Sequence, residues 1–295
     1  MARVLVFGAG AVGGYFGGCL QRGGHEVVFV ARGPNLEALR SDGLHVTGAM
    51  GSFDLSVDAV DAASGDFDLV LVCVKSYDLD DATVAGGIVL TLQNGVDAPF
   101  RVREKVGDVV LGGSTGIVAD LPEPGHVHVT SNYAWIRFGE LDGRGVTERV
   151  SRLESWLDVE GIEPIVAADA RVSLWEKMAL MCGMAGLTTL HQKPMGELMS
   201  DPSTRAEFEA IVRECYGVAL AKHVPLDDAF IAKRIHYAEG IDPAAMSSMS
   251  RDFARGRKIE LETFNGAMVR MGADLGIDVP HNRAVYDAIK AARSG

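Results

Sequence analysis

A glycine-rich segment near the start of the chain has the spacing of a phosphate-binding turn. Residues 4–7 are apolar and β-prone, and glycines follow at positions 8, 10 and 13, where an amphipathic helical pattern begins. In such a strand–turn–helix unit Gly8 makes the turn, Gly10 admits a pyrophosphate, and Gly13 lets the helix pack closely. We expect a dinucleotide here, and a glycine turn without a ligand is the alternative. The expected contacts are Gly8, Gly10, Ala11, Val12 and Gly13.

Two basic residues follow later strands in the same half of the chain. Arg32 comes after the strand expected over residues 27–30, where an NAD enzyme usually carries an acidic residue for the ribose 2′-hydroxyl. A guanidinium can instead bind a 2′-phosphate through paired hydrogen bonds, which favours NADPH. Lys75 follows the strand over residues 69–74, at the sheet edge that binds ligands, and is a candidate contact for cofactor or substrate. A solvated side chain is the alternative for both.

Lys177 lies among apolar residues in a helical pattern. A partly buried ammonium can stabilise negative charge and donate a proton. Trp175, Met178 and Leu180 flank Lys177 in a helical pattern, and their apolar character predicts partial burial. A solvated lysine on the helix surface is the alternative.

The elements that position these residues change in kind along the chain. In the first half, β-rich runs at residues 4–7, 27–30, 69–74 and 88–92 alternate with helical patterns. Their continuous apolar character is typical of strands buried on both faces of a parallel sheet. Strand-like segments between residues 112 and 140 are expected to extend the same sheet. The predicted fold is an α/β Rossmann-type parallel sheet domain.

The strand signal ends near residue 171. Helical patterns then cover residues 174–190, 205–223, 228–239, 259–276 and 282–292. We therefore predict an NADPH-binding Rossmann domain over residues 1–167, followed by an all-α domain over residues 168–295 that supplies catalytic and substrate-binding residues.

Composition excludes several classes of function. The formal net charge is -12 and Lys and Arg are not clustered, so a nucleic-acid partner is not expected. The cysteines, and the histidines at positions 126, 128, 191 and 223, lack the spacing of a metal site. No apolar run approaches the roughly twenty residues that span a bilayer, and the start of the chain lacks an export signal, so we expect a cytoplasmic protein without a membrane role.

The glycine-rich turn, Arg32 and Lys75, together with further segments, resemble the ketopantoate reductase family. The matching segments follow the family's order along nearly the whole chain. The additional segments are Gln93-Asn94-Gly95-Val96, Ser247-Ser248-Met249 and Glu260-Leu261-Glu262-Thr263-Phe264-Asn265-Gly266. A fourth, Leu174-Trp175-Glu176-Lys177-Met178-Ala179, surrounds the candidate proton donor and resembles the segment that carries the family's catalytic lysine.

The resemblance implies a role for each of these residues. Lys177 would be the catalytic acid, because delivery of a hydride to a ketone builds negative charge on the oxygen, which requires a proton donor and electrostatic stabilisation. Glu260 would be the carboxylate that orients it. Asn94 would lie near the nicotinamide and the substrate. Ser247 or Ser248 would bind the substrate, and the sequence does not decide which. An ordinary Asn-Gly turn and an exposed helix carboxylate remain the alternatives for Asn94 and Glu260.

Two features depart from the family pattern. Family members that reduce ketopantoate usually carry Asn one and two turns beyond the catalytic lysine, on the face towards the substrate. Met181 and Ala185 occupy these substrate-facing positions here. The connection between Lys75 and Asn94 is also shorter than usual, which predicts a stunted helix.

The expected function is NADPH-dependent reduction of a 2-oxo acid to a 2-hydroxy acid, with ketopantoate as the default substrate. One alternative is a paralogue that reduces a different, less polar carbonyl compound. Another is an NADPH-binding sensor without catalysis, which Met181 and Ala185 favour and which the pair Lys177 and Glu260 opposes. The oligomeric state is left open, a homodimer included.

Overall fold

The structure is a computed structural model that describes residues 1–81 and 86–294. Contacts between residues divide the chain into two compact units. One comprises Met1–Gln93 and Asp97–Ser173, and the other comprises Asn94–Val96 and Leu174–Gly295. The division predicted at residues 167 and 168 falls between strand β12 (Glu163–Val166) and helix α5 (Ala170–His191).

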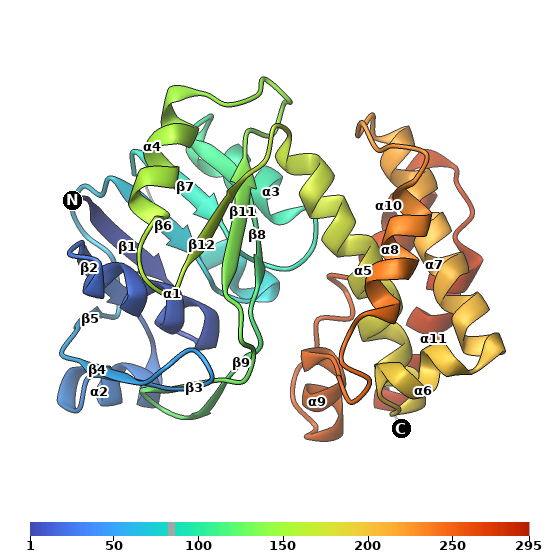
Figure 1. The fold of residues 1–295 in the computed structure, drawn as a ribbon, viewed down its shortest axis with the longest axis horizontal. Helices are drawn as coiled ribbons and strands as arrows, with labels where there is room; N and C mark the ends of the chain where they lie inside the picture. The colour runs from blue at the N-terminus through green and yellow to red at the C-terminus, as the bar shows by residue number, and fades with distance from the viewer. Residues whose placement is uncertain (82–85, 295) are drawn as a thin grey trace. The chain divides into compact units, whose positions relative to one another are not determined.

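A mainly parallel sheet forms the centre of the first unit (Figure 1). Among the described residues it has eight strands in the order β12-β11-β8-β7-β6-β1-β2-β5. Neighbouring strands pair in parallel, except that β8 and β11 are antiparallel. The remaining bounds are β1 Arg3–Phe7, β2 Glu26–Val30, β5 Asp58–Val60, β6 Leu69–Val72, β7 Ile88–Thr91, β8 Val110–Gly116 and β11 Trp135–Gly139. The predicted α/β Rossmann class is therefore confirmed.

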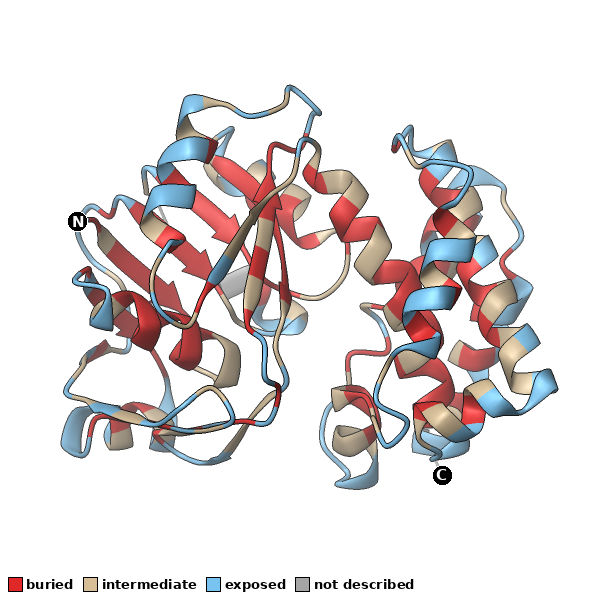
Figure 2. Cartoon of the chain, viewed as in Figure 1, coloured by how far each residue is buried: buried red, intermediate tan, exposed pale blue. Residues whose placement is uncertain are grey.

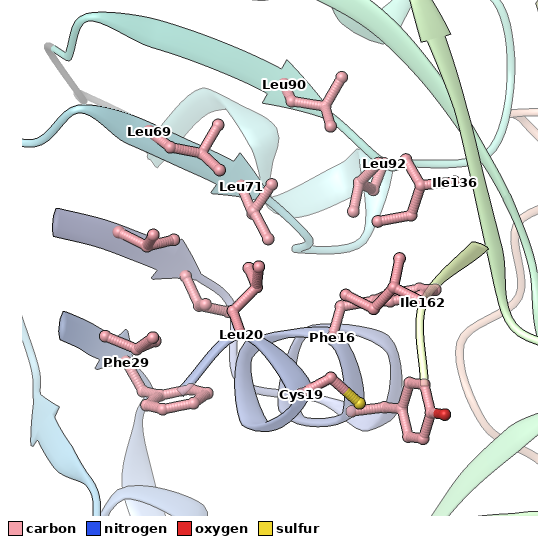
Figure 3. Packing of buried hydrophobic residues seen from close by; sticks show 14 of the residues in the cluster. Phe16, Cys19, Leu20, Phe29, Leu69, Leu71, Leu90, Leu92, Ile136 and Ile162 are labelled. Carbon is pink, nitrogen blue, oxygen red and sulfur yellow. The ribbon is translucent and has the colours of Figure 1, made fainter. Parts of the chain in front are cut away.

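Strands β6 and β7 are buried along their whole length, as their continuous apolar sequences predict (Figure 2). Helices α1 (Ala11–Arg22) and α4 (Glu148–Leu157) contribute to one hydrophobic cluster with the sheet, in which Phe16 and Leu20 of α1 and Leu71 of β6 are fully buried (Figure 3). Helix α3 (Ala98–Val106) packs on β7 and β8. Gly17 lets α1 approach closely, because a Cβ at this position would lie 2.5 Å from the Phe29 ring.

A second sheet corrects one expectation. Strands β9 (Ala119–Glu123) and β10 (His126–Val129) do not extend the large sheet but join β3 (Leu44–Gly48) and β4 (Phe53–Leu55) in the order β4-β3-β10-β9. Strand β10 pairs in parallel with β3, which lies some eighty residues earlier in the sequence. Local alternation of apolar residues cannot reveal so distant a partner. The apolar face of this sheet packs on α1 and belongs to the same hydrophobic cluster.

The second unit is helical, which confirms the predicted class. Helix α5 continues into it from residue 174, and α7 packs against α6, α8, α10 and α11. A Cβ at Gly183 of α5 would lie 2.5 Å from the Phe208 ring of α7, so glycine permits their close contact. The bounds are α6 Met195–Ser200, α7 Pro202–Ala221, α8 Phe230–Glu239, α9 Ser248–Ala254, α10 Asn265–Leu275 and α11 Pro280–Ser294.

The helix predicted over residues 259–276 begins later than expected. Helix α10 starts at Asn265, and residues 261–264 form turns. The backbone carbonyl of Glu260 accepts hydrogen bonds from the amides of Thr263 and Phe264, while its carboxylate accepts one from Asn94. This tertiary contact overrides the helical propensity of the Glu-Leu-Glu sequence.

Between β6 and β7 the structure describes a short 3₁₀-helix over Ser76–Asp81. The rest of the stunted helix predicted for this connection falls on residues 82–85, which lie outside the described residues. Among the helices that the structure describes, none combines the length and the apolar character that a membrane crossing requires.

Candidate active site

The glycine turn after β1 has room for a ligand beside its backbone. Gly8 adopts a φ of +107°, and a Cβ there would lie 2.7 Å from the amide nitrogen of Val74. A Cβ at Gly13 would lie 2.1 Å from the carbonyl oxygen of Gly8, so helix α1 packs directly on the turn. A Cβ at Gly10 would meet no atom within 4 Å. Two glycines therefore serve packing, whereas Gly10 borders open space.

Helix α1 presents an N-terminus suited to an anion. Its N-cap residue, Gly10, makes no side-chain cap, and the first turn contains no acidic residue. The first hydrogen bond of the helix runs from the amide of Gly14 to the carbonyl of Gly10 at 2.7 Å, so the amides of Ala11, Val12 and Gly13 precede the helical ladder. These groups and the helix dipole favour a phosphate group. The residues present therefore fit a dinucleotide.

The two basic candidates of this unit are exposed. Arg32 is the N-cap residue of helix α2 (Gly33–Ser41) and directly follows the buried Ala31 beyond β2. Gly33 adopts a φ of +54°, a left-handed conformation in which a larger residue would be strained. Lys75 lies between β6 and the 3₁₀-helix, at the carboxyl edge of the sheet. Exposure leaves both side chains accessible to a ligand and to solvent.

Asn94 and Glu260 are brought together within the helical unit. The Asn94 side-chain amide donates a hydrogen bond to a carboxylate oxygen of Glu260, with Nδ2 3.2 Å from Oε2. Glu260 is only 5% exposed, in the non-helical segment before α10. Gly95 has a φ of +89°, and a Cβ there would lie 2.8 Å from Cγ2 of Thr263. The contact therefore orients the carboxylate expected to act with Lys177.

Gln93, which the sequence analysis named only as part of a segment, is a buried polar residue beside Asn94. It follows β7, is 6% exposed, and neither its Nε2 nor its Oε1 has a hydrogen-bond partner among the described residues. Buried amides are normally hydrogen-bonded, so the position is unusual. Only its place beside Asn94 could have drawn attention to it.

Lys177 lies in the part of α5 that belongs to the helical unit. Trp175 and Met178 are buried, and Lys177 is half-buried, as its apolar neighbours predict. One turn beyond the lysine, Met181 is also half-buried, whereas Ala185, two turns beyond, is fully buried. The helix face that continues from Lys177 is therefore apolar.

The two candidate serines have different environments. Ser247 is the N-cap residue of α9, where its Oγ accepts a hydrogen bond from the Ser250 amide and lies 2.8 Å from Oγ1 of Thr188. It is 3% exposed. Ser248, the first residue of α9, is half-buried. The Ser247 hydroxyl is thus engaged within the protein, and Ser248 is the more accessible of the pair.

The sequence analysis predicts no metal site. Within residues 1–81 and 86–294, no group of three or more His, Cys, Asp or Glu side chains has an arrangement that could hold a metal ion.

Comparison with known proteins places the chain in a family of reductases. The family model of ketopantoate reductase PanE/ApbA matches residues 4–143, and the model of its C-terminal part matches residues 169–293. A 2-dehydropantoate 2-reductase of Archaeoglobus fulgidus is 33% identical over 301 residues, which cover 99% of this chain and 98% of that protein.

Solved structures agree. A PanE/ApbA family ketopantoate reductase from Ralstonia eutropha JMP134 has a TM-score of 0.87 at 31% identity, over 99% of this chain and 98% of that one. D-mandelate dehydrogenase with NADH and anilino(oxo)acetate has a TM-score of 0.90, over 99% of this chain and 98% of that one, but at 22% identity the likeness shows the fold alone. By sequence and by fold, this chain belongs to the ketopantoate reductase PanE/ApbA family of oxidoreductases.

Proposed function

We propose that the protein reduces a 2-oxo acid to a 2-hydroxy acid with NADPH. The observation that carries the proposal is the glycine turn, which combines an uncapped helix N-terminus with open space at Gly10 in a chain that belongs to a reductase family. When bound, NADPH supplies the hydride. The amides of Ala11, Val12 and Gly13 bind the pyrophosphate, and Arg32 binds the 2′-phosphate.

Arg32 is the reason to favour NADPH over NADH. An exposed guanidinium at the N-cap of α2 replaces the acidic residue that would accept hydrogen bonds from a ribose 2′-hydroxyl. The fold itself does not decide the cofactor, because D-mandelate dehydrogenase, which shares it, was solved with NADH. Lys75 is a further candidate contact for the cofactor or the substrate.

Lys177 acts as the proton donor in the proposed reaction. Its ammonium stabilises the negative charge that develops on the carbonyl oxygen and then transfers a proton to that oxygen. Glu260 holds the ammonium in place, and its own carboxylate is oriented by Asn94 at 3.2 Å. Ser248 binds the substrate carboxylate, because the Ser247 hydroxyl is already engaged with Thr188 and the Ser250 amide.

The environment of α5 favours a substrate less polar than ketopantoate. Met181 lines the face beyond Lys177, and the nearby hydroxyl of Thr188 contacts Ser247 and the Met184 carbonyl. Neither Thr188 nor Ser247 is therefore available to replace the amides that the family usually places there. Ketopantoate remains the reference substrate, because the relative from Archaeoglobus fulgidus is named for 2-dehydropantoate, which is ketopantoate. The oligomeric state stays open, and a cytoplasmic location remains a prediction from the sequence.

NADPH oxidation with a panel of 2-oxo acids tests the proposal. The panel contains ketopantoate and acids of similar size whose side groups lack a hydroxyl. We expect turnover that depends on the 2-oxo acid and is fastest with a less polar member. NADPH binding without turnover on any member would indicate a sensor, and fastest turnover on ketopantoate would support the default substrate.

A further inference from the structure

We propose that Asn35 is a positioning residue that fixes the spacing between the pyrophosphate and 2′-phosphate subsites and thereby sets the preference for NADPH. The inference rests on the proposed function. Asn35 lies in the first turn of α2, three residues after Arg32, and its side chain makes hydrogen bonds to the backbone of Ala9 and Gly125. Its effect is therefore exerted through other residues.

The Asn35 carboxamide joins two segments that are distant in the sequence. Its Nδ2 donates a hydrogen bond to the carbonyl oxygen of Ala9, inside the glycine turn, at 2.8 Å. Its Oδ1 accepts one from the amide of Gly125, in the turn between β9 and β10, also at 2.8 Å. The half-buried amide of Asn35 therefore acts both as a hydrogen-bond donor and as an acceptor, at normal hydrogen-bond distances.

The bond to Ala9 completes the support of the glycine turn. The amides of Gly8 and Ala9 both donate to the carbonyl of Val30, at the end of β2. The Asn35 side chain donates to the carbonyl of Ala9. Ala9 is therefore held by β2 through its amide and by α2 through its carbonyl. Gly10, which borders the open space, follows directly.

The bond to Gly125 holds α2 from its other side. Gly125 has a φ of +76°, and a Cβ there would lie 3.3 Å from the Ala38 side chain, so the turn lies close to α2. The start of α2 is thus fixed between the glycine turn and the small sheet. Because Arg32 is the N-cap residue of this helix, the same contacts fix the origin of its side chain.

An amide is the side chain that this position requires. An Asp could accept from Gly125 but could not donate to Ala9, and it would add negative charge near the expected phosphates. An Ala would make neither bond. NADH lacks the 2′-phosphate and does not need the spacing between Arg32 and the glycine turn. Loss of Asn35 should therefore weaken NADPH binding more than NADH binding.

Fluorescence titration of NADPH and NADH tests this, at a temperature where each variant is folded by circular dichroism. We expect Asn35→Ala to raise the Kd for NADPH about tenfold, the factor that corresponds to one net hydrogen bond, and to raise the Kd for NADH less than about threefold. Asn35→Asp should weaken NADPH at least as much, although it keeps the Gly125 contact.

Gln21→Ala is the matched control. Gln21 is a half-buried amide in α1 whose Nε2 donates to the carbonyl of Ser56 at 2.8 Å, in a helix that starts at the glycine turn. It should leave the ratio of the two Kd values unchanged. If Asn35→Ala alters both Kd values equally, or if Asn35→Asp binds NADPH like the unmutated protein, the positioning role is wrong. If the unmutated protein does not prefer NADPH, the proposed cofactor itself is wrong.

Discussion

At the scale of single residues, the proposed chemistry depends on Lys177. Lys177→Ala should lower kcat by about a hundred- to ten-thousandfold, since a general acid contributes that much, while the Kd for NADPH stays within about twofold. Steady-state kinetics and cofactor titration measure the two effects. Lys222→Ala, an exposed lysine at the end of α7, is the control and should change neither. Near-normal turnover of Lys177→Ala would show that the lysine is structural.

Arg32 carries the cofactor prediction. Loss of a charge-assisted hydrogen bond costs on the order of 1.5 to 3 kcal/mol, so Arg32→Ala should reduce the preference for NADPH over NADH by roughly ten- to a hundredfold. The ratio of kcat/KM for the two cofactors measures it. Arg40→Ala, at another exposed arginine of α2, should leave the ratio unchanged. Equal use of both cofactors by the unmutated protein would contradict the assignment.

The site residues that the sequence predicts without the resemblance share one property: their type and spacing are tied to the local chain. The glycines of the turn and the apolar neighbours of Lys177 are of this kind. Asn35 and Gln93 were missed because their significance lies in tertiary contacts, namely hydrogen bonds to Ala9 and Gly125 for the first and burial for the second. Similarly, only the structure distinguishes Ser247 from Ser248.

At the scale of elements, helix α5 carries the substrate prediction. Met181→Asn should raise kcat/KM for ketopantoate about tenfold relative to a less polar 2-oxo acid, because an amide can bond the substrate hydroxyl. Ala185 is fully buried, so an Asn there would be overpacked, and the single variant is the cleaner test. Met199→Asn, at a half-buried methionine of α6, is the control. An unchanged ratio would remove Met181 from the substrate site.

The buried ion pair at the start of α4 gives a stability prediction. Glu140 is 1% exposed and accepts hydrogen bonds from Thr147 at 2.6 Å and from Nε of Arg149 at 2.8 Å. Burial alone would raise the pKa of this carboxyl, but the hydrogen bonds from Arg149 and Thr147 and the charge of Arg149 lower it below its ordinary value. Glu140→Gln should therefore reduce the free energy of unfolding by about 2 kcal/mol at pH 7.

The pH dependence of this effect follows from the direction of the shift. A carboxyl whose pKa is lower in the folded state stabilises the protein above its unfolded pKa of about 4.3, and the contribution is lost as the pH falls through the folded value. Urea unfolding at several pH values should show the difference between Glu140→Gln and the unmutated protein shrinking below about pH 4. Glu148→Gln, at an exposed carboxylate of α4, should cost less than about 1 kcal/mol at any pH. A difference that does not change with pH would contradict the ionic origin.

Elements were predicted well where their signal is local. Strands β1, β2, β6 and β7 are apolar runs, and the sequence locates each within about two residues. The small sheet was missed because β3 and β10 pair across a long sequence separation. The start of α10 was misplaced because the contact between Glu260 and Asn94 replaces a helical turn that propensity alone favours.

At the scale of the whole molecule, family membership and fold make the protein an oxidoreductase, and the residues decide what it reduces. The net charge of -12 does not oppose an anionic cofactor, because the expected phosphate contacts are backbone amides and Arg32. The chain divides into a Rossmann unit and a helical unit. In the proposed function, the Rossmann unit binds the cofactor and the helical unit supplies the proton donor.

The most direct test of hydride transfer uses NADPH that carries deuterium at the transferable position of the nicotinamide. The unmutated protein is incubated with this cofactor and the best 2-oxo acid of the panel, and the product is analysed by mass spectrometry. The proposed reaction predicts a 2-hydroxy acid with one deuterium on the carbon that carried the ketone. A product without deuterium, or no product although NADPH binds, would contradict it.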